Sequence, residues 1–408
     1  MEKEFDVVII GGGVAGMMLA ANIENKKVLI IEKNEKLGKK MFITGKGRCN
    51  VTNLCDKEDF FKNIITNSKF MFSSYSNFSN YDCYSFFEEN GVPLKVERGD
   101  RVFPQSDKSS DLISSLTNKI KKMGVKVNYN EKVVSLSKEN ECFLVKSDKD
   151  MYKCAVVAIC TGGVSYKATG STGDGYVFSK MMGHTIVSPA PALIPLVLKE
   201  DVSSLAGLAL KNVSVWYENE KDKSEKLFGE MLFTHRGVSG PIILSLSSYI
   251  NRKNIENANL FIDLKPALSE EQLITRLERD VKGNKKQIKT LLVDYLPKNL
   301  IDIFLKYCKI KDSVSSYQLN SVQIKTLVKA FKRFGFTIKA FEDINAAIVT
   351  SGGVNVDEVN PKTLMSKKVE NLYFAGEVLD VDALTGGFNI QIALSTAMAA
   401  AKNINLTK

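Results

Sequence analysis

The sequence lacks the paired cysteines of a disulfide framework and the clustered ligands of a zinc site. Its seven cysteines are an odd number scattered along the chain, and no two of them form a CxxC pair. Long hydrophobic runs are also missing, because the longest apolar stretch, residues 7–21, is too short to span a bilayer and carries four glycines. The same stretch has no signal-peptide cleavage pattern. We therefore expect a cytoplasmic protein with reduced thiols, no metal site and no membrane segment.

The composition is otherwise that of an ordinary globular protein. Of the 408 residues, 44% are apolar and 25% are charged, which excludes a disordered or fibrous chain. At roughly 150 residues per domain, this length predicts two or three domains around a large core.

Positive charge is in excess, and it is confined to one region. The formal net charge is +10, from 56 Lys and Arg against 46 Asp and Glu. Residues 276–339 hold 15 basic and 5 acidic residues, a difference of +10, so the rest of the chain holds 41 of each sign. The charge therefore belongs to a local surface and not to the chain as a whole.

A helix is predicted at the end of this region, over residues 321–334. Its apolar face consists of Val322, Ile324, Leu327, Val328, Phe331 and Phe334. The basic residues outside that face are Lys325, Lys329, Lys332 and Arg333. Two interpretations stay open for these four residues: a solvated lysine face, or a surface that binds the RNA backbone.

The N-terminal residues have the pattern of a dinucleotide-binding unit. An apolar strand over 5–10 leads into Gly11-Gly-Gly-Val-Ala-Gly16, followed by a helix over 17–24 and a second strand over 27–32 that ends in Glu32. Gly11 permits a tight turn, Gly13 lets the backbone approach a pyrophosphate, and Gly16 permits close packing of helix and strand. Glu32 can accept hydrogen bonds from ribose hydroxyls. The alternative is a tight turn of glycines with no ligand.

Two further segments favour FAD over NAD as the resident dinucleotide. A long glycine-bearing loop, residues 33–53, follows Glu32 where a further helix would be expected in an NAD dehydrogenase. Near the C-terminus, a strand over 372–377 ends in Gly376-Glu377, and residues 385–392 open a helix rich in small residues. Glu377 can hold the ribityl hydroxyls, and the helix N-terminus can stabilise negative charge on reduced flavin.

The order of predicted elements indicates an α/β fold with insertions. We expect a discontinuous Rossmann-like FAD-binding domain that carries an inserted small β domain and an inserted basic helical domain. The predicted boundaries are 1–188 and 336–408 for the FAD-binding domain, 189–268 for the β domain and 269–335 for the helical insert. Prolines 189, 191 and 195 mark the first boundary, and a capping box at Ser269-Glu-Glu-Gln272 opens the helical insert.

Several longer blocks resemble a known family. They are GGGVAGMMLA (11–20), GKKMFITGKGRCNVTN (38–53), RVFPQSDKSSD (101–111), ATGSTGDGY (168–176), MLFTHRGVSGP (231–241) and the two blocks within 352–397. The chain resembles the BaiN/RdsA family of NAD(P)/FAD-dependent oxidoreductases, also catalogued as aminoacetone oxidase-like flavoproteins. It departs from the family pattern at Lys46, where a third glycine is common, and at Arg236, where an aromatic residue is common.

The motifs and the resemblance together give the candidate cofactor-binding residues. They are Gly11, Gly12, Gly13, Ala15, Gly16, Glu32, Lys33, Lys40, Gly45, Arg48, Asn50, Val133, Thr161, Gly162, Gly376, Glu377, Gly387, Phe388, Asn389 and Ile390. The resemblance also implies NAD(P)H as the electron donor.

Three side chains are candidates for catalysis. Cys49 lies in the block that flanks the flavin and could deliver a proton, or it could be a small buried thiol that packs there. Arg48 could polarise a carbonyl, or it could pair with a carboxylate. His235, one of only two histidines, could act as a general acid or form a structural hydrogen bond.

The resemblance implies reduction of activated C=C bonds, by one arm on bile-acid intermediates and by another on uridine in large-subunit ribosomal RNA. We expect the RNA substrate, because an uncharged enone needs no basic surface. Two alternatives remain: a small-molecule flavin reductase or oxidase acting on an enone or an aminoketone, and a flavin-bound ribosome-associated factor without turnover.

Overall fold

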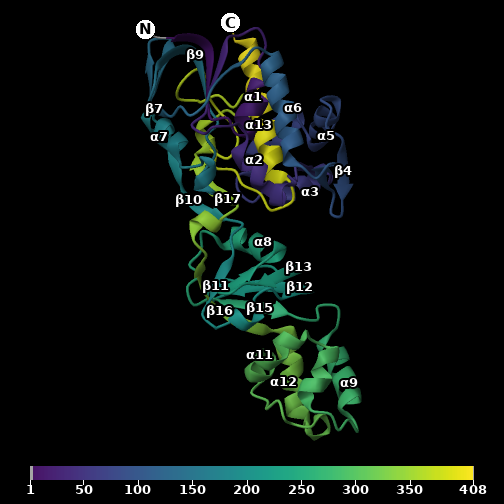
Figure 1. The fold of residues 1–408 in the computed structure, drawn as a ribbon. Helices are drawn as coiled ribbons and strands as arrows, with labels where there is room; N and C mark the ends of the chain where they lie inside the picture. Colours follow the sequence, from purple (N-terminus) through teal and green to yellow (C-terminus); the bar gives the residue numbers. More distant parts are fainter. Residues whose placement is uncertain (1–2, 408) are drawn as a thin grey trace. The chain divides into compact units, whose positions relative to one another are not determined.

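The computed structural model describes residues 3–407, and the chain folds as two compact units (Figure 1). The first unit runs up to Ala192 and resumes at Ile344, and the second unit comprises Leu193–Asp343. None of the helices in the described residues combines the length and the apolar character needed to cross a membrane.

A seven-stranded sheet forms the centre of the first unit, in the order β6-β2-β1-β9-β8-β7, with β18 also paired to β9. The strands are β1 (Lys3–Ile10), β2 (Val28–Ile31), β6 (Lys126–Asn128), β7 (Val133–Glu139), β8 (Cys142–Ser147), β9 (Met151–Ile159) and β18 (Leu372–Phe374). β6, β2, β1, β9 and β18 are parallel, whereas β8 and β7 are antiparallel. Val7, Val8 and Ile9 are all fully buried, as expected for a strand covered on both faces. The predicted α/β fold with a parallel Rossmann-type sheet is confirmed.

Three helices pack beside one another against this sheet. They are α1 (Val14–Ala20), α6 (Ser109–Lys122) and α13 (Phe388–Leu406), and α1 contacts both of the others (Figure 1). Small residues let α13 lie close to its neighbours: Ala397, Ala400 and Ala401 are fully buried. The remaining helices of this unit are α2 (Lys39–Ile43), α3 (Lys57–Lys62), α4 (Met71–Asn77), α5 (Asn80–Glu89) and α7 (Asp174–Met181).

Two small sheets complete the first unit. One has the order β3-β5-β4, with β3 at Thr52–Asn53, β4 at Leu94–Glu97 and β5 at Arg101–Pro104. Its β4–β5 hairpin turns at Gly99 and Asp100, both at positive φ. The other pairs β10 (Ile186–Ala192) with β17 (Val349–Val354).

A closed six-stranded barrel forms the core of the second unit, in the order β11-β14-β13-β12-β15-β16. The strands are β11 (Leu196–Leu198), β12 (Ala209–Glu218), β13 (Leu227–Phe233), β14 (Gly237–Ser239), β15 (Asn259–Asp263) and β16 (Phe334–Phe341), all paired antiparallel. Helix α8 (Pro241–Ile250) packs on β12 and β13. Closure leaves no free sheet edge in this part of the chain.

The helices between β15 and β16 share the hydrophobic core of the barrel. They are α9 (Glu270–Val281), α10 (Ile288–Leu291), α11 (Lys298–Cys308) and α12 (Ser321–Lys332). Phe304 of α11 contacts Phe331 of α12 at 4.7 Å and Phe334 of β16 at 5.6 Å between ring centroids. The predicted capping box at Ser269 and Gln272 is present. The predicted apolar face of α12 is buried except for Val322, which lies in the first turn and is 69% exposed.

The unit boundaries differ from the expected ones at both ends of the insertion. Pro189 and Pro191 lie inside β10, so the first unit continues to Ala192. Residues 334–341 form β16, which pairs with both β11 and β15, so the second unit extends to Asp343. The division of the second unit into a β part and a helical part stays a proposal, because one hydrophobic cluster runs through both.

The glycine turn after β1 makes a prediction about stability. A Cβ on Gly16 would lie 2.0 Å from the carbonyl oxygen of Gly11, whereas a Cβ on Gly13 would meet nothing within 4 Å. We expect Gly16→Ala to lower the free energy of unfolding of the first unit by about 2 kcal/mol through overpacking. The matched variant Gly13→Ala should change it by less than about 0.5 kcal/mol.

Far-UV circular dichroism during urea unfolding measures this difference. The single tryptophan, Trp216, lies in β12 of the second unit, so its fluorescence is an internal control that should not change. Equal stability of the two variants would contradict the role assigned to Gly16.

Candidate functional site

Glu32 lies at the carboxyl end of β2, against the glycine turn. One carboxylate oxygen accepts a hydrogen bond from the Gly12 backbone N–H at 2.6 Å. The other accepts two from Asn34, at 2.8 Å from the backbone and 2.7 Å from the side chain. Glu32 is 7% exposed. Three of a carboxylate's approximately four acceptor positions are therefore filled, which fixes the side chain and leaves one for a ligand hydroxyl.

The glycine turn itself leaves room for a ligand. Gly11 has a φ of +102° and approaches the Cys160 carbonyl, so only glycine fits there. Gly13 instead faces open space, because a Cβ there would have no neighbour within 4 Å. No described side chain caps the first turn of α1, which includes Ala15. The backbone of this turn is thus accessible to an oxygen-rich group such as a pyrophosphate.

Glu377 joins four segments of the first unit that are distant in sequence. It follows β18 and accepts hydrogen bonds at 2.9 Å from both the Thr350 backbone N–H of β17 and the Ser165 hydroxyl after β9. The Lys40 ammonium of α2 lies 2.5 Å from the other carboxylate oxygen and 2.7 Å from the Ser165 hydroxyl. The Lys40 and Glu377 side chains are 22% and 20% exposed. We call these four residues the Glu377 cluster.

The Glu377 cluster contains residues that sequence reasoning missed. Lys40 and Glu377 were predicted, but Ser165 and Thr350 were not. The Thr350 hydroxyl accepts the backbone N–H groups of Val164 at 2.8 Å and Ser165 at 3.1 Å, which fixes the loop after β9. The only sequence signal was that Ser165 lies shortly after two of the predicted cofactor residues. A single serine or threonine in such a place is too common to indicate a site.

The N-terminus of α13 is held open by a close backbone approach. Gly387 has a φ of +99°, and a Cβ there would lie 2.5 Å from the Thr52 backbone, so only glycine fits. The Asn389 side chain bonds the backbone of Ala383 through both its oxygen and its nitrogen, at 2.9 and 2.7 Å. No described side chain caps the backbone N–H groups of the first turn, which includes Phe388 and Ile390. The predicted contribution of Asn389 is therefore restricted to its backbone.

The other predicted cofactor residues lie beside strands of the same sheet, and some of their side chains are already paired within the protein. Lys33 pairs with Asp174 at 2.7 Å, so its ammonium is committed within the protein. Gly376 follows β18, and a Cβ there would lie 2.8 Å from that of Ala15. Thr161 and Gly162 follow β9. Val133 begins β7, next to the segment that bonds Glu32 and Asn34.

The loop after α2 holds its backbone in an uncommon conformation. Gly45, Lys46, Gly47 and Cys49 all have a φ between +56° and +87°. Lys46 thus occupies a left-handed conformation that favours glycine, the residue common there in the resembled family. The Asn50 side-chain oxygen is buried, and no hydrogen-bond partner exists for it among residues 3–407. An unsatisfied buried acceptor beside a strained loop indicates a missing ligand.

Arg48 is engaged by carboxylates. Its Nε donates to Asp107 at 2.7 Å, its terminal nitrogens bond Glu97, and its guanidinium lies 4.3 Å over the Phe103 ring. These hydrogen bonds to Glu97 and Asp107 raise the pKa of Arg48. This geometry fits the interpretation in which Arg48 pairs with a carboxylate. The catalytic and cofactor-binding roles of Arg48 stay predictions.

Cys49 is completely buried in the structure. Its exposed fraction is 0%, and this burial raises the pKa of the thiol to about 12. The group therefore holds its proton at neutral pH and lies out of reach of a dissolved substrate. This environment favours the packing role for Cys49, and its role as a proton donor stays a prediction.

The second unit contains the other predicted side chains. His235 is exposed in the turn between β13 and β14. Lys332 does not belong to an open basic surface: it is 16% exposed, pairs with buried Asp263 at 2.7 Å and donates to two backbone carbonyls. Arg333 pairs with Glu218 at 2.9 Å and stacks on Phe261. Lys332 is thus used inside the fold, whereas Arg333 is paired but about half exposed, and the RNA contacts of all four residues stay predictions.

Lys325 and Lys329 remain exposed on α12, and no ion pair involves either among residues 3–407. Within the same part of the chain, no group of His, Cys, Asp and Glu side chains could hold a metal ion.

Comparison with known proteins gives matches along the whole chain. Residues 5–403 match the family described as HI0933-like protein Rossmann domain. The chain is 31% identical over 414 residues to a ribosomal RNA dihydrouridine synthase of Escherichia coli, which covers 100% of this chain and 99% of that protein. It is 29% identical to a protein of the same name from Haemophilus influenzae, covering 99% and 100%. It is also 28% identical to a 3-dehydro-bile acid delta(4,6)-reductase of Clostridium scindens, covering 97% of each chain.

Solved structures share the fold at low sequence identity. The crystal structure of 3-ketosteroid delta1-dehydrogenase from Sterolibacterium denitrificans superimposes with a TM-score of 0.53 at 12% identity and covers 100% of both chains. This likeness establishes the arrangement of the fold and nothing about the substrate.

The burial of Cys49 predicts its reactivity. At pH 8, iodoacetamide should modify Cys49 in the native protein at least tenfold more slowly than the half-buried Cys142 of β8, because the Cys49 thiol is both inaccessible and protonated. In urea the two rates should become similar. Mass spectrometry of the peptides after timed quenching measures both rates, and equal modification of the two cysteines in the native protein would contradict the packed environment.

Proposed function

Because the chain belongs to the HI0933-like protein Rossmann domain family, in agreement with the resemblance found in its sequence, we propose that it is an FAD-dependent reductase of an activated C=C bond. We propose uridine in large-subunit ribosomal RNA as the substrate and NAD(P)H as the electron donor. The overall reaction converts uridine, NAD(P)H and one proton into dihydrouridine and NAD(P)+.

The full-length similarity to two kinds of reductase carries this proposal. The names of the relatives describe a dihydrouridine synthase and a bile-acid reductase, and each match covers 97% or more of both chains. Dihydrouridine differs from uridine by two hydrogens across a C=C bond conjugated to a carbonyl. A delta(4,6)-reductase acts on the same type of bond, so the shared chemistry is hydride addition to an electron-poor carbon.

Observed features of the first unit fit the predicted cofactor. The open backbone at Gly13 suits the pyrophosphate, and Glu32 retains one acceptor position for a ribose hydroxyl. Lys40 and Glu377 would contact the ribityl chain, and the unpartnered oxygen of Asn50 has a donor to gain. When bound, FAD supplies hydride-transfer chemistry that no side chain of this protein provides.

The chain's own residues would orient the cofactor and control charge. The uncapped first turn of α13 presents backbone N–H groups and the positive end of a 19-residue helix, which favours a neighbouring negative charge. Lys40 neutralises Glu377, so this carboxylate does not oppose that effect. Among the predicted proton donors, His235 is exposed to solvent, whereas Cys49 is buried.

The localised charge supports RNA over a small molecule. Residues 276–339 carry the entire excess of +10, and a phosphate backbone is the partner that such a surface attracts most strongly. A small-molecule enone reductase is the second candidate, supported by the 28% identity to the bile-acid reductase.

The Glu377 cluster predicts how the protein retains its cofactor. Glu377→Gln should weaken FAD binding at least tenfold, because the substitution removes the charge that holds Lys40 and places an amide N–H₂ beside the ammonium. Asp150→Asn is the matched control, since Asp150 pairs with Lys3 at 2.5 Å on the surface of the same unit. The flavin-to-protein ratio from visible absorbance after dialysis measures the effect. Equal FAD retention by the two variants would contradict the role assigned to Glu377 in FAD binding. A colourless wild-type protein would contradict FAD as the cofactor.

A deletion strain tests the substrate. Dihydrouridine is heavier than uridine by two hydrogens. Mass mapping of the large-subunit ribosomal RNA should therefore show dihydrouridine at one position in the parent strain and uridine there in the deletion strain, and the wild-type gene should restore the dihydrouridine. The Glu377→Gln gene should restore little of it, because the variant protein retains little FAD. Ribosomal RNA that is unchanged by the deletion would reject the RNA substrate and favour the small-molecule enone.

A further inference from the structure

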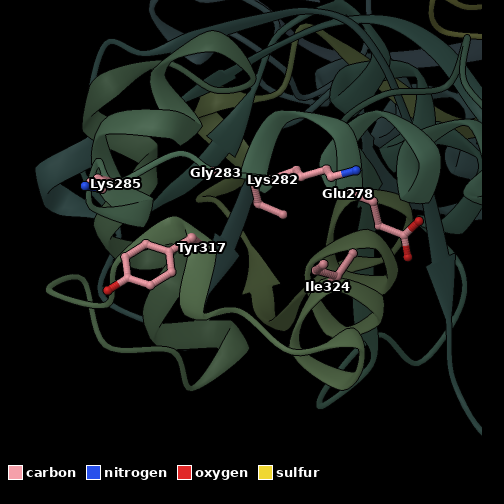
Figure 2. A pocket seen from close by; sticks show the side chains of 7 residues that line it. Glu278, Lys282, Gly283, Lys285, Tyr317 and Ile324 are labelled. Atoms are coloured by element: carbon pink, nitrogen blue, oxygen red, sulfur yellow. The ribbon is translucent and has the colours of Figure 1, made fainter.

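An open pocket lies among the helices of the second unit, outside the site described above. Its volume is about 590 Å³. It is lined by Glu278, Val281, Lys282, Gly283, Lys285, Tyr317 and Ile324. Figure 2 shows the Tyr317 ring and Lys285 on one side, with Lys282, Glu278 and Ile324 on the other. We call it the Tyr317 pocket. An aromatic ring, aliphatic side chains and two ammonium groups thus meet around one opening.

The Tyr317 ring is exposed although its backbone is fixed. The side chain is 54% exposed, and its backbone N–H donates to the Asn284 carbonyl at 3.1 Å. The adjacent Ser316 donates to the Lys286 carbonyl at 2.8 Å through both its backbone and its hydroxyl. A well-anchored segment thus presents a large ring to solvent. Such a ring loses little conformational entropy when a flat ligand stacks on it.

The charge around the pocket is not neutralised within the protein. Lys282, Lys285 and the neighbouring Lys286 are exposed, and none of them forms an ion pair among residues 3–407. By contrast, Arg333 and Lys332 at the barrel end of α12 are paired with Glu218 and Asp263. The free part of the regional charge therefore includes the rim of the pocket, so an anionic partner gains a neutralisation that the fold does not already supply.

We propose that the Tyr317 pocket binds an unpaired nucleotide of single-stranded RNA: one base stacks on Tyr317, and Lys282 and Lys285 contact the flanking phosphates. The proposal rests on the proposed function, because it takes RNA as the partner of this chain. It adds an RNA contact beyond the predicted basic residues of α12, and no comparison assigns it.

The chemistry of the lining favours a single strand over a duplex. Every base has a flat face that stacks on an aromatic ring, but bases in a duplex are already stacked on one another. Val281 and Ile324 supply apolar contacts for the base. Glu278 is the one carboxylate in the lining, and it can accept hydrogen bonds from a base N–H, whereas it repels a phosphate. The phosphates would therefore follow the lysine side.

A binding assay with the holoenzyme tests the stacking contact. The probe is a fluorescein-labelled single-stranded RNA oligonucleotide without secondary structure, and its affinity is measured by anisotropy. Tyr317→Ala should weaken binding by about 5- to 150-fold, the range that stacking of one base supplies. Tyr317→Phe keeps the ring and should bind within about twofold of wild type. A blunt RNA duplex should be insensitive to both substitutions.

Salt dependence tests the lysines. The double variant Lys282→Ala, Lys285→Ala should reduce the slope of log affinity against log salt by about 1.4, since each phosphate contact on a single strand contributes about 0.7. The matched double variant Lys146→Ala, Lys149→Ala removes two exposed lysines of the first unit and should leave the slope unchanged. Circular dichroism and flavin content establish that each variant is folded.

Three results would overturn the proposal. They are unchanged binding by Tyr317→Ala, equal changes in slope for the two double variants, and displacement by poly-glutamate that matches displacement by RNA at equal charge. Failure of the proposed function has a different outcome: ribosomal RNA is unchanged in the deletion strain, while Tyr317→Ala still weakens binding of the oligonucleotide. The two ideas are therefore tested separately.

Discussion

The partly buried charge of Glu377 is the constraint on which the carboxyl edge of the central sheet depends. A carboxylate removed from water is costly unless donors and a countercharge surround it. Lys40, Ser165 and Thr350 supply them, from positions 337, 212 and 27 residues away in sequence. None of these partners is local to the strand that carries Glu377. The cluster therefore forms only when the N-terminal half and the C-terminal segment of the first unit have assembled around the insertion.

The second unit shows how a basic surface can be both charged and rigid. The barrel and the helices share one hydrophobic cluster, in which Phe304, Phe331 and Phe334 connect α11, α12 and β16. Lys332 reinforces this junction through Asp263, which is 5% exposed at the end of β15. The exposed Lys325 and Lys329 are thus carried by a helix that belongs to this packed core, which limits the backbone entropy lost when they contact a partner.

Local patterns were sufficient for the fold, and they also predicted several residues of the candidate site. The glycine turn, Glu32, Lys40 and Glu377 were predicted, because backbone sterics and strand order specify them within short segments. Ser165 and Thr350 could not be predicted, since their importance comes only from their meeting Glu377 in space.

The predictions about the basic helix were limited in the same way, because the sequence does not show contacts between residues that are distant along the chain. The period of α12 separated its apolar face from its charged residues, but a period does not reveal the neighbouring elements. Both Lys332 and Arg333 lie outside the apolar face, yet both form ion pairs within the fold. Lys332 pairs with Asp263, which is 69 residues away in sequence, and Arg333 pairs with Glu218, which is 115 residues away. The sequence therefore placed the charge in a region but could not show which of its basic residues are already paired within the fold.

The localised charge bears on how the proposed RNA binding and the predicted flavin chemistry respond to salt. Outside residues 276–339 the positive and negative residues are equal in number, and the pair Lys40–Glu377 is about one-fifth exposed. Partly buried pairs at contact distance are screened little by salt, whereas exposed lysines attract a polyanion over about one Debye length, roughly 8 Å at physiological ionic strength. In the proposed function, ionic strength would therefore act on RNA association through the exposed lysines of the second unit and leave the electrostatics around the predicted cofactor nearly constant. The proposed RNA contacts can therefore change through exposed lysines of the second unit, without disturbing the Lys40–Glu377 pair of the first unit.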